Sequence, residues 1–321
     1  MNTELWQPSA TIETLKHRAA ILANIRVFFS ERSVLEVDTP VLSHAAVCDP
    51  FIDAMTVEYR HFPSDDAQHY YLQSSPEYAM KRLLAAGSGC IYQMSKVFRN
   101  GEVGSKHNPE FTMLEWYRLG FDEHQLMDEV AAIVTAAIGI CDFKRISYQQ
   151  LFLQYLDVDI NTANDQVLVD KMAEHIEVSG DFDRDGWLNL LMSHCIEPQL
   201  AGAVFVYNYP ASQAALAKVK LDTDGNAVAA RFELFIDGVE LANGYHELTD
   251  ADEQQQRFNL DQQQRARLSL PQRPLDTNLV AALKQGMPDC AGVALGVDRL
   301  VMLALKKQNI SEILPFDFIR A

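Results

Sequence analysis

The sequence predicts an α+β domain in which helices flank an antiparallel sheet. Segments with strand and helix patterns alternate irregularly along the 321 residues, with hairpins among them. Residues 231–248 give a strong hairpin signal, because Asp237-Gly238 separates two apolar-rich runs and supplies left-handed turn conformations. No Pro-, Gly- or Ser-rich linker divides the chain, so residues 11–321 are expected to form one domain after an N-terminal arm, residues 1–10.

The first half of this domain is expected to begin with a helix and continue with strands around a polar loop. Apolar residues at helical spacing predict a helix over 11–32. Ser75, Pro76 and Gly87 fit the start and end of a helix over 74–87. Strand patterns cover residues 34–40, 90–99 and 110–118.

The second half combines further helices with the hairpin. Helices are expected from Glu123 to about Gly180, where Ser147 and Gln150 have the spacing of a capping box. A long polar helix should follow Asp250. The remaining segments are helices over 184–200 and 277–286, a strand over 203–210, and a strand leading into a helix over 292–305.

Composition and charge limit the classes of function that are possible. The chain is 48% hydrophobic and 22% charged, which is typical of a globular protein with a core. Its net charge of −17 disfavours a nucleic-acid backbone as partner and favours small molecules or a protein. No membrane span or secretory signal is recognisable, and five scattered cysteines without a C-x-x-C pair indicate buried thiols in a reducing cytoplasm.

The hairpin carries two carboxylates on one face. A two-residue turn at Asp237-Gly238 pairs Phe235 with Glu240 and Glu233 with Ala242. Glu233 and Glu240 then become diagonal neighbours, roughly 7–8 Å apart. Carboxylates at that separation repel each other unless a cation lies between them, and phosphate-bound Mg²⁺ fits. The alternative is a solvated face with two ordinary surface glutamates.

Further along the hairpin, Asn243 and Glu247 add an amide and a carboxylate. A straight ladder would place both on the opposite face, and Gly244 is a candidate for a bulge that re-aims them.

Two other segments carry arginines at positions suited to phosphate. In GVALGVDR (292–299), bare backbone at Gly292 and Gly296 would let a flat ring or a phosphate approach, and Arg299 falls in the first turn of the expected helix. Arg99 and His107 flank the loop between two strands, where they could clamp a phosphoryl group. A packing glycine pair with a surface arginine is an equally good interpretation of the first segment alone.

Together these segments resemble the catalytic domain of class II aminoacyl-tRNA synthetases, and within that class the lysyl type. FSERSVLEVDTPVL (29–42), FRNGEVGSKHNPEFTMLE (98–115) and GVALGVDR are similar to its three motifs in order. FELFIDGVELANGYHELTDADEQ (232–254) is very similar to the lysyl-type segment before the third motif. The first helix starts near residue 11, so no anticodon-binding domain is expected. This combination resembles the elongation factor P lysine ligases, paralogues of that catalytic domain.

The resemblance implies an ATP-dependent ligase. It would activate (R)-β-lysine, or lysine, as an aminoacyl-adenylate with Mg²⁺ and transfer it to a lysine side chain of elongation factor P, releasing AMP and pyrophosphate. It also implies a cytoplasmic homodimer that uses neither tRNA nor a membrane. Two alternatives stay open: a lysyl-tRNA synthetase-like enzyme that acts on tRNA, and a paralogue that binds a ligand without catalysis.

For the nucleotide, the resemblance implies that Arg99 holds the α-phosphate, Arg299 the γ-phosphate, and Phe111 stacks on adenine. Glu233 and Glu240 would bind Mg²⁺. The implied ATP-binding residues also include Asn100, Gly101, His107, Asn108, Glu240, Leu241 and Gly296. Lysyl-type enzymes usually have glutamate where Gly101 stands, and Glu102 follows it here.

For the amino acid, the resemblance implies that Glu247 receives the side-chain ammonium with help from the Tyr117 hydroxyl. Glu77 would bind the other amine, and Asn243 the carboxylate region. Ser75 and Pro76 complete the implied substrate contacts. Ala294 stands where lysyl-tRNA synthetases usually have glycine, which favours the β-amino isomer.

Overall fold

The computed structural model describes residues 6–140, 142–176, 178, 180 and 182–321. Half of the expected arm and Cys141 therefore lie outside the described residues. In the part described, no helix has the length and apolarity needed to cross a membrane.

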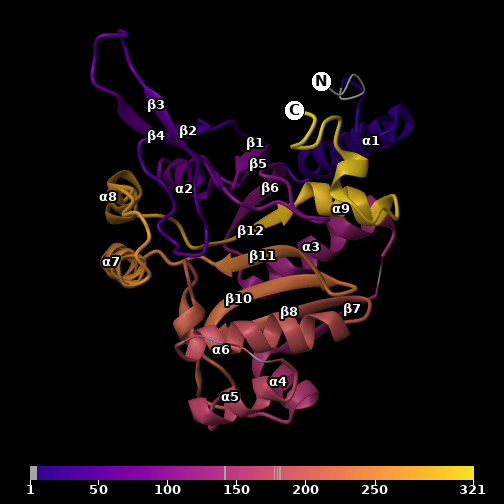
Figure 1. The fold of residues 1–321 in the computed structure, drawn as a ribbon, viewed down its shortest axis with the longest axis vertical. Helices are drawn as coiled ribbons and strands as arrows, with labels where there is room; N and C mark the ends of the chain where they lie inside the picture. Colours follow the sequence, from indigo (N-terminus) through magenta and orange to yellow (C-terminus); the bar gives the residue numbers. More distant parts are fainter. Residues whose placement is uncertain (1–5, 141, 177, 179, 181) are drawn as a thin grey trace.

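The centre of the domain is a large, mostly antiparallel sheet (Figure 1). In the described residues its strand order is β1-β5-β6-β12-β11-β10-β8-β7, and β9 pairs with β10. Only β1 with β5 and β7 with β8 run parallel among these pairs. The strands are β1 Leu35–Glu36, β5 Ile91–Phe98, β6 Glu110–Leu119, β7 Phe143–Ser147, β8 Ala203–Pro210, β9 Val219–Leu221, β10 Ala227–Ile236, β11 Val239–His246 and β12 Cys290–Gly296. The predicted antiparallel α+β architecture is confirmed.

A small second sheet lies beside the edge of the main sheet that β1 forms, and it extends away from the main sheet in Figure 1. Its order is β2-β4-β3, with β2 Leu42–Ser43, β3 Thr56–Tyr59 and β4 Gln68–Leu72. Asn100 connects to it, because its backbone N–H donates to the Asp53 carbonyl at 2.8 Å.

Helices cover the main sheet because each strand sends alternate side chains to opposite faces. In β10, Phe232, Leu234 and Ile236 pack into the core shared with α1, α3 and α9, whereas Phe235 packs under α4 and α6. A third core joins α2, α7 and α8. The helices are α1 Ile12–Ser30, α2 Glu77–Ala85, α3 Glu123–Ile138, α4 Tyr148–Leu156, α5 Asp165–Ala173, α6 Arg184–Leu191, α7 Ala251–Arg267, α8 Thr277–Gln285 and α9 Val297–Ala304.

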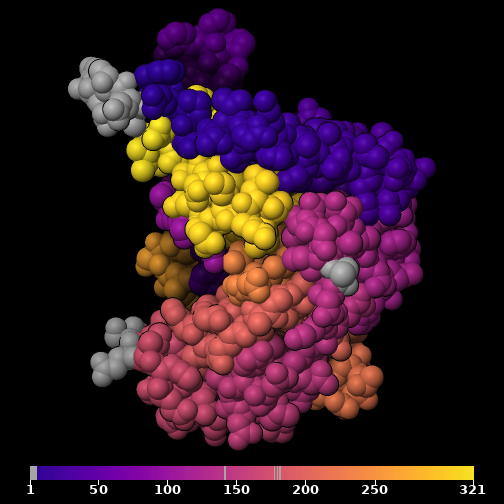
Figure 2. All heavy atoms as spheres, turned by 90° about the vertical axis from the view of Figure 1, so that its right-hand side faces the viewer, coloured from indigo at the N-terminus to yellow at the C-terminus, as the bar shows by residue number. Residues whose placement is uncertain are grey.

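The two ends of the chain lie side by side. Figure 2 shows the indigo N-terminal helix against the yellow C-terminal segment. The backbone N–H of Ser9 donates to the Pro315 carbonyl at 2.8 Å, and that of Phe318 donates to Asn108 Oδ1 at 3.0 Å. The C-terminal segment therefore also fixes the loop that contains Asn108.

The hairpin turn forms as predicted, with φ of 48° at Asp237 and 74° at Gly238. The predicted pairing of Glu233 with Ala242 is wrong. A bulge lies between Glu240 and Ala242, so Leu234 pairs with Ala242 and Glu233 pairs with Asn243. The extra residue changes which face the rest of β11 presents.

The candidate bulge residue Gly244 has a different role. A Cβ atom there would lie 2.4 Å from Cζ of Phe232, so glycine leaves room for that buried ring. The bulge that re-aims Asn243 occurs three residues earlier than expected.

Most other elements match the expected segments, but the strands β2, β3, β4, β7 and β9 were not predicted. The strand expected over 34–40 has only two residues in the ladder. α2 begins after Pro76 and not at it, although Ser75 Oγ accepts from the Glu77 N–H at 3.0 Å. β7 interrupts the region expected to be helical, and its capping box at Ser147 and Gln150 starts α4. The helix expected over 184–200 continues after α6 as short π and 3₁₀ turns.

Candidate functional site

One cavity brings most of the expected residues together. It opens on the face of β6, β11 and β12 and is bounded by α2, the loop after β5 and the start of α9. Its empty space, with the open solvent at its mouth included, is about 1010 Å³. The expected residues that line it are Ser75, Glu77, Arg99, His107, Asn108, Phe111, Tyr117, Glu240, Leu241, Asn243, Glu247, Ala294, Gly296 and Arg299.

Strand register explains this convergence. Asn243 pairs with Ala294 and Tyr245 with Gly292, while Ala294 and Gly292 pair with Glu115 and Tyr117 on the other side. Directly paired residues share a face, so these side chains point to the cavity together.

Four of the expected residues do not line the cavity. Pro76 precedes α2, and Glu233 lies deeper in the sheet. The Asn100 side chain donates to Asp53 Oδ2 at 2.8 Å. Gly101 has a φ of 78°, a conformation that suits glycine, and Glu102 lines the cavity in its place, 3.7 Å from Arg99 Nη1.

At one end of the cavity, Arg299 contacts Glu240, His107 and the Lys106 carbonyl. Its Nη1 donates to the Glu240 carbonyl at 2.7 Å, and its Nη2 lies 2.7 Å from His107 Nε2. Burial and the Arg299 cation lower the pKa of His107, so the ring is neutral and Nε2 accepts. Arg99 lies over the Phe111 ring, with Cζ 5.2 Å from its centre. This end presents cations and an aromatic face to a ligand.

The opposite end is a buried carboxylate cluster around one lysine. Lys81 Nζ lies 2.6 Å from Oε1 of Glu77 and 2.5 Å from Oε2 of Glu247. Glu115 accepts from Ser75 Oγ at 2.6 Å, and the Tyr117 hydroxyl lies 3.4 Å from it. Sequence reasoning missed Lys81 and Glu115, although the i, i+4 spacing of Glu77 and Lys81 on a helix was a usable signal.

Burial and crowding determine the proton affinity of this cluster. Burial first, then the neighbouring Glu77, raise the pKa of Glu115 to about 8. Burial also raises the pKa of Glu247, to about 7, although Lys81 opposes the shift. The cluster therefore favours any ligand that brings positive charge.

Gly292 leaves room for the Tyr117 ring and the Glu247 carboxylate to lie next to the backbone in this cluster. A Cβ atom at this position would lie 2.3 Å from Cε1 of Tyr117 and 2.4 Å from Oε1 of Glu247. The expectation that bare backbone here admits a ligand ring is wrong at Gly292, because the chain's own Tyr117 occupies that space.

Comparison with known families fits this geometry. The family model of class II tRNA synthetases (D, K and N) matches residues 5–319. The chain belongs to the class II tRNA synthetase family.

Within this family, similar curated proteins carry one name. A protein of Yersinia enterocolitica is 49% identical, over 99% of this chain and 99% of its own length, and is named elongation factor P–(R)-beta-lysine ligase. Proteins of Yersinia pestis and Yersinia pseudotuberculosis with the same name are 48% identical over 98% of both chains. The chain thus corresponds to essentially the whole length of these members of the class II synthetase family.

Acidic residues gather near the end of the cavity that holds Arg299 and Glu240. Burial, then Glu233 and Glu240, raise the pKa of Glu197 to about 7, and Glu240 contributes to the raised pKa of Glu233. Glu233 is also held by Arg231 Nη2 at 2.5 Å and by the Tyr209 hydroxyl at 2.6 Å. Within the described residues, no three such side chains are grouped closely enough to bind a metal by themselves.

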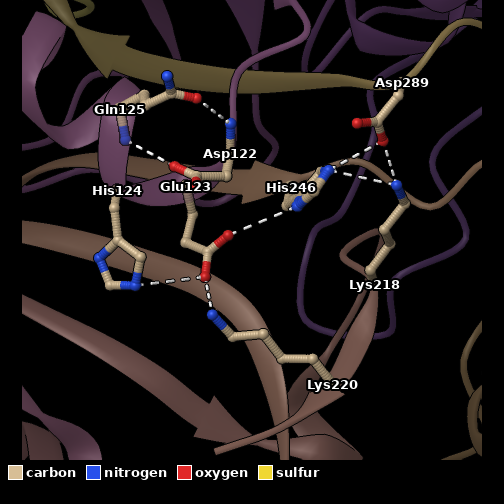
Figure 3. Close-up of polar contacts among 8 residues, drawn as sticks. All are labelled: Asp122, Glu123, His124, Gln125, Lys218, Lys220, His246 and Asp289. Atoms are coloured by element: carbon tan, nitrogen blue, oxygen red, sulfur yellow. Dashed lines mark hydrogen bonds and ion pairs between the residues drawn. The ribbon is translucent and has the colours of Figure 1, made fainter.

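Behind Glu247, on the other face of the sheet, a charged network anchors its neighbour His246 (Figure 3). His246 Nδ1 lies 3.5 Å from Glu123 Oε2, and its Nε2 lies 2.9 Å from Asp289 Oδ1. Lys220 contacts Glu123, Lys218 contacts Asp289, and His124 Nε2 is 3.6 Å from Glu123 Oε1. The network joins the start of α3 to the ends of β11 and β12.

Proposed function

We propose that this chain activates (R)-β-lysine, or lysine, with ATP and transfers the aminoacyl group to a lysine side chain of elongation factor P. The observation that carries the proposal is one cavity with arginines at one end and a buried cluster of carboxylates at the other. Phosphates suit the first end and a substrate with two amines suits the second. The names of the similar curated proteins support the choice of (R)-β-lysine and of elongation factor P.

In the first step, a carboxylate oxygen of the amino acid attacks the α-phosphorus of ATP, and pyrophosphate leaves. Arg99 stabilises the charge that develops on the α-phosphate, and Arg299 binds the γ-phosphate. The contacts of Arg299 with the Glu240 carbonyl and neutral His107 orient it before the nucleotide arrives. Phe111 offers its ring to adenine. Asn108, Leu241 and Gly296 shape the same end of the cavity.

Glu240 and Glu233 are the residues that would hold Mg²⁺. The donor set fits, because Mg²⁺ prefers oxygen ligands and commonly combines one or two carboxylates with substrate phosphates. Burial is the main cause of the raised pKa values of Glu197 and Glu233, and repulsion from Glu240 adds to both. A cation bound beside Glu233 and Glu240 would offset that repulsion. Bound there, Mg²⁺ would neutralise phosphate charge.

At the amino-acid end, Glu247 and Tyr117 would bind the side-chain amine, and Glu77 the other amine. Asn243 lies opposite Ala294 in the ladder, where it can reach the carboxylate of the amino acid. The Ala294 methyl group narrows the floor of this region, and a difference of one methylene is worth about 1–3 kcal/mol in a pocket. We therefore propose a preference for the β-amino isomer, with lysine as a poorer substrate.

In the second step, the acceptor amine attacks the carbonyl carbon of the adenylate, an amide forms, AMP leaves and the amine loses a proton. The net charge of −17 supports a protein acceptor over tRNA. A homodimer in the cytoplasm completes the proposal and rests on the motif resemblance.

ATP–pyrophosphate exchange tests the activation step. We expect exchange that depends on (R)-β-lysine or lysine, and an Arg99→Gln variant should lose it by roughly 100-fold or more, as for loss of a transition-state charge contact. A charge change distant from the cavity, Lys16→Gln on exposed α1, is the matched control and should leave exchange unchanged. Absence of exchange in the unaltered chain with either amino acid would favour the ligand-binding paralogue.

A further inference from the structure

Lys81 lies directly behind the amino-acid end of the cavity. Its side chain projects from α2, is 2% exposed and contacts the carboxylates of Glu77 and Glu247. Both glutamates line the cavity, whereas Lys81 does not. Each carboxylate therefore directs one oxygen at Lys81 and keeps its second oxygen for a ligand.

The free oxygen of Glu247 is already placed. Its Oε1 atom faces the space that glycine leaves open at position 292, beside the Tyr117 ring. The contact of Oε2 with Lys81 fixes the rotation of the carboxylate, and so fixes where Oε1 points. The same reasoning applies to Oε2 of Glu77, since Lys81 takes its Oε1.

The charges around Lys81 do not balance. Glu77, Glu115 and Glu247 are three carboxylates, and Lys81 is the buried cation that touches two of them. A buried charge is costly unless it is paired, so with all three carboxylates ionised the subsite lacks two positive charges. In the empty site protons on Glu115 and Glu247, whose pKa values are raised, make up part of this deficit. The other titratable groups facing this cluster are Tyr117 on β6, Tyr245 on β11 and Cys290 on β12. His246, on the opposite face of the sheet, adds only a coulombic effect that lowers the pKa of Glu247.

We propose that Lys81 is a positioning residue that fixes the Glu77 and Glu247 carboxylates and leaves two negative charges for a substrate with two amines. This inference rests on the proposed function and adds the feature that selects diamino acids. A diamino acid supplies the two missing charges. A monoamino acid of the same length, such as norleucine, leaves one carboxylate without a partner.

The test compares Lys81→Met with Arg82→Met, which removes an exposed cation from the next position of the same helix. In ATP–pyrophosphate exchange, Lys81→Met should raise the KM for lysine and (R)-β-lysine by roughly 10- to 100-fold, the loss expected for a charge-assisted contact. The KM for ATP should change by less than about twofold, as should every constant of the control. Equal rises in both KM values, or an unchanged amino-acid KM, would overturn the proposal.

The pH dependence of the amino-acid KM distinguishes loss of the Lys81 charge from a general loss of folding. Without Lys81 the three carboxylates hold protons more tightly, so an incoming ammonium group must displace them. The pH at which the amino-acid KM reaches its minimum should therefore rise in Lys81→Met. Lys81→Gln, which keeps hydrogen-bond donors without the charge, should show the same upward shift, and an unshifted profile in both variants would contradict the role in charge balance.

A measurement on the unaltered chain covers the case in which neither variant folds. Because the pKa of Glu115 is raised to about 8 and that of Glu247 to about 7, the empty site holds between one and two protons at neutral pH. Calorimetry in buffers of different ionisation heat should show release of about one to two protons per lysine bound, and less release at pH 9. Binding without proton release at neutral pH would mean that the cluster holds no unmatched negative charge for the ligand, and would overturn the proposal.

Failure of this inference is distinguishable from failure of the proposed function. If the unaltered chain shows no exchange with either amino acid, the proposed function is contradicted. If it shows exchange and the Lys81→Met amino-acid KM is unchanged, only the role of Lys81 is contradicted.

Discussion

Gly292 and Gly244 lie on neighbouring strands and leave room for different partners. A Cβ at Gly292 would meet Tyr117 and Glu247 on the cavity face, whereas one at Gly244 would meet Phe232 in the core. A methyl group added at Gly292 should therefore disturb the site, whereas one added at Gly244 should disturb only core packing.

We expect Gly292→Ala and Gly244→Ala to cost similar stability, about 1–3 kcal/mol each, as overpacked positions do. Only Gly292→Ala should also raise the amino-acid KM strongly, because Tyr117 and Glu247 must move. Thermal unfolding and ATP–pyrophosphate exchange measure the two effects. An equal change of amino-acid KM in both variants would show that Gly292 acts through general stability.

Single residues also show what the sequence could and could not predict about the site. The motifs predicted Glu77, Tyr117 and Glu247 at the amino-acid end, and all three line the cavity. Lys81 was missed because a lysine in a helical pattern is usually at the surface, and only the fold brings α2 against Glu247, just after β11. Glu115 was missed because strand alternation alone does not reveal which face is a cavity.

At the scale of elements, local patterns predicted the positions of most helices and strands, but they did not predict the pairing register of the strands. The Asp237-Gly238 turn and the capping box at Ser147 and Gln150 depend on a few adjacent residues and formed as predicted. The bulge in β11 depends on how β10 packs against both its neighbours, so the sequence of β11 alone did not place it. β7 and β9 were missed because they are short and pair at the edge of the sheet.

The network around His246 connects elements through charges that titrate. The contact with Glu123 raises the pKa of His246, with a smaller contribution from Asp289, against the effect of burial. Burial would raise the pKa of Glu123, but His246 and Lys220 lower it to about 2. His246 therefore stabilises the fold fully below its ordinary pKa of 6.5, and this stabilisation is lost as pH rises through the raised value. Glu123 stabilises above its ordinary pKa of 4.5 and loses its effect as pH falls toward 2.

We therefore expect a His246→Gln variant to differ most from the unaltered chain between about pH 4.5 and 6.5, where both partners carry their charges. The difference in thermal unfolding midpoint should shrink above that window. His17→Gln, which changes an exposed histidine on α1, is the control and should show little change at any pH. A midpoint difference that grows from pH 6 to pH 9 would contradict this account of the network.

At the scale of the whole molecule, the account depends on which acceptor receives the aminoacyl group. The match to the class II family extends over residues 5–319, and the proposed adenylate chemistry is common to enzymes with different acceptors. The net charge of −17 gives the molecule a field that repels a polyanion and tolerates a protein. The choice of acceptor is therefore the central claim.

The most direct measurement offers elongation factor P and total tRNA together to the chain, with ATP, Mg²⁺ and radiolabelled (R)-β-lysine or lysine. The account predicts label on elongation factor P in an amide bond that resists mild alkali, and none on tRNA, where an ester bond would be cleaved. Label on tRNA alone would contradict it.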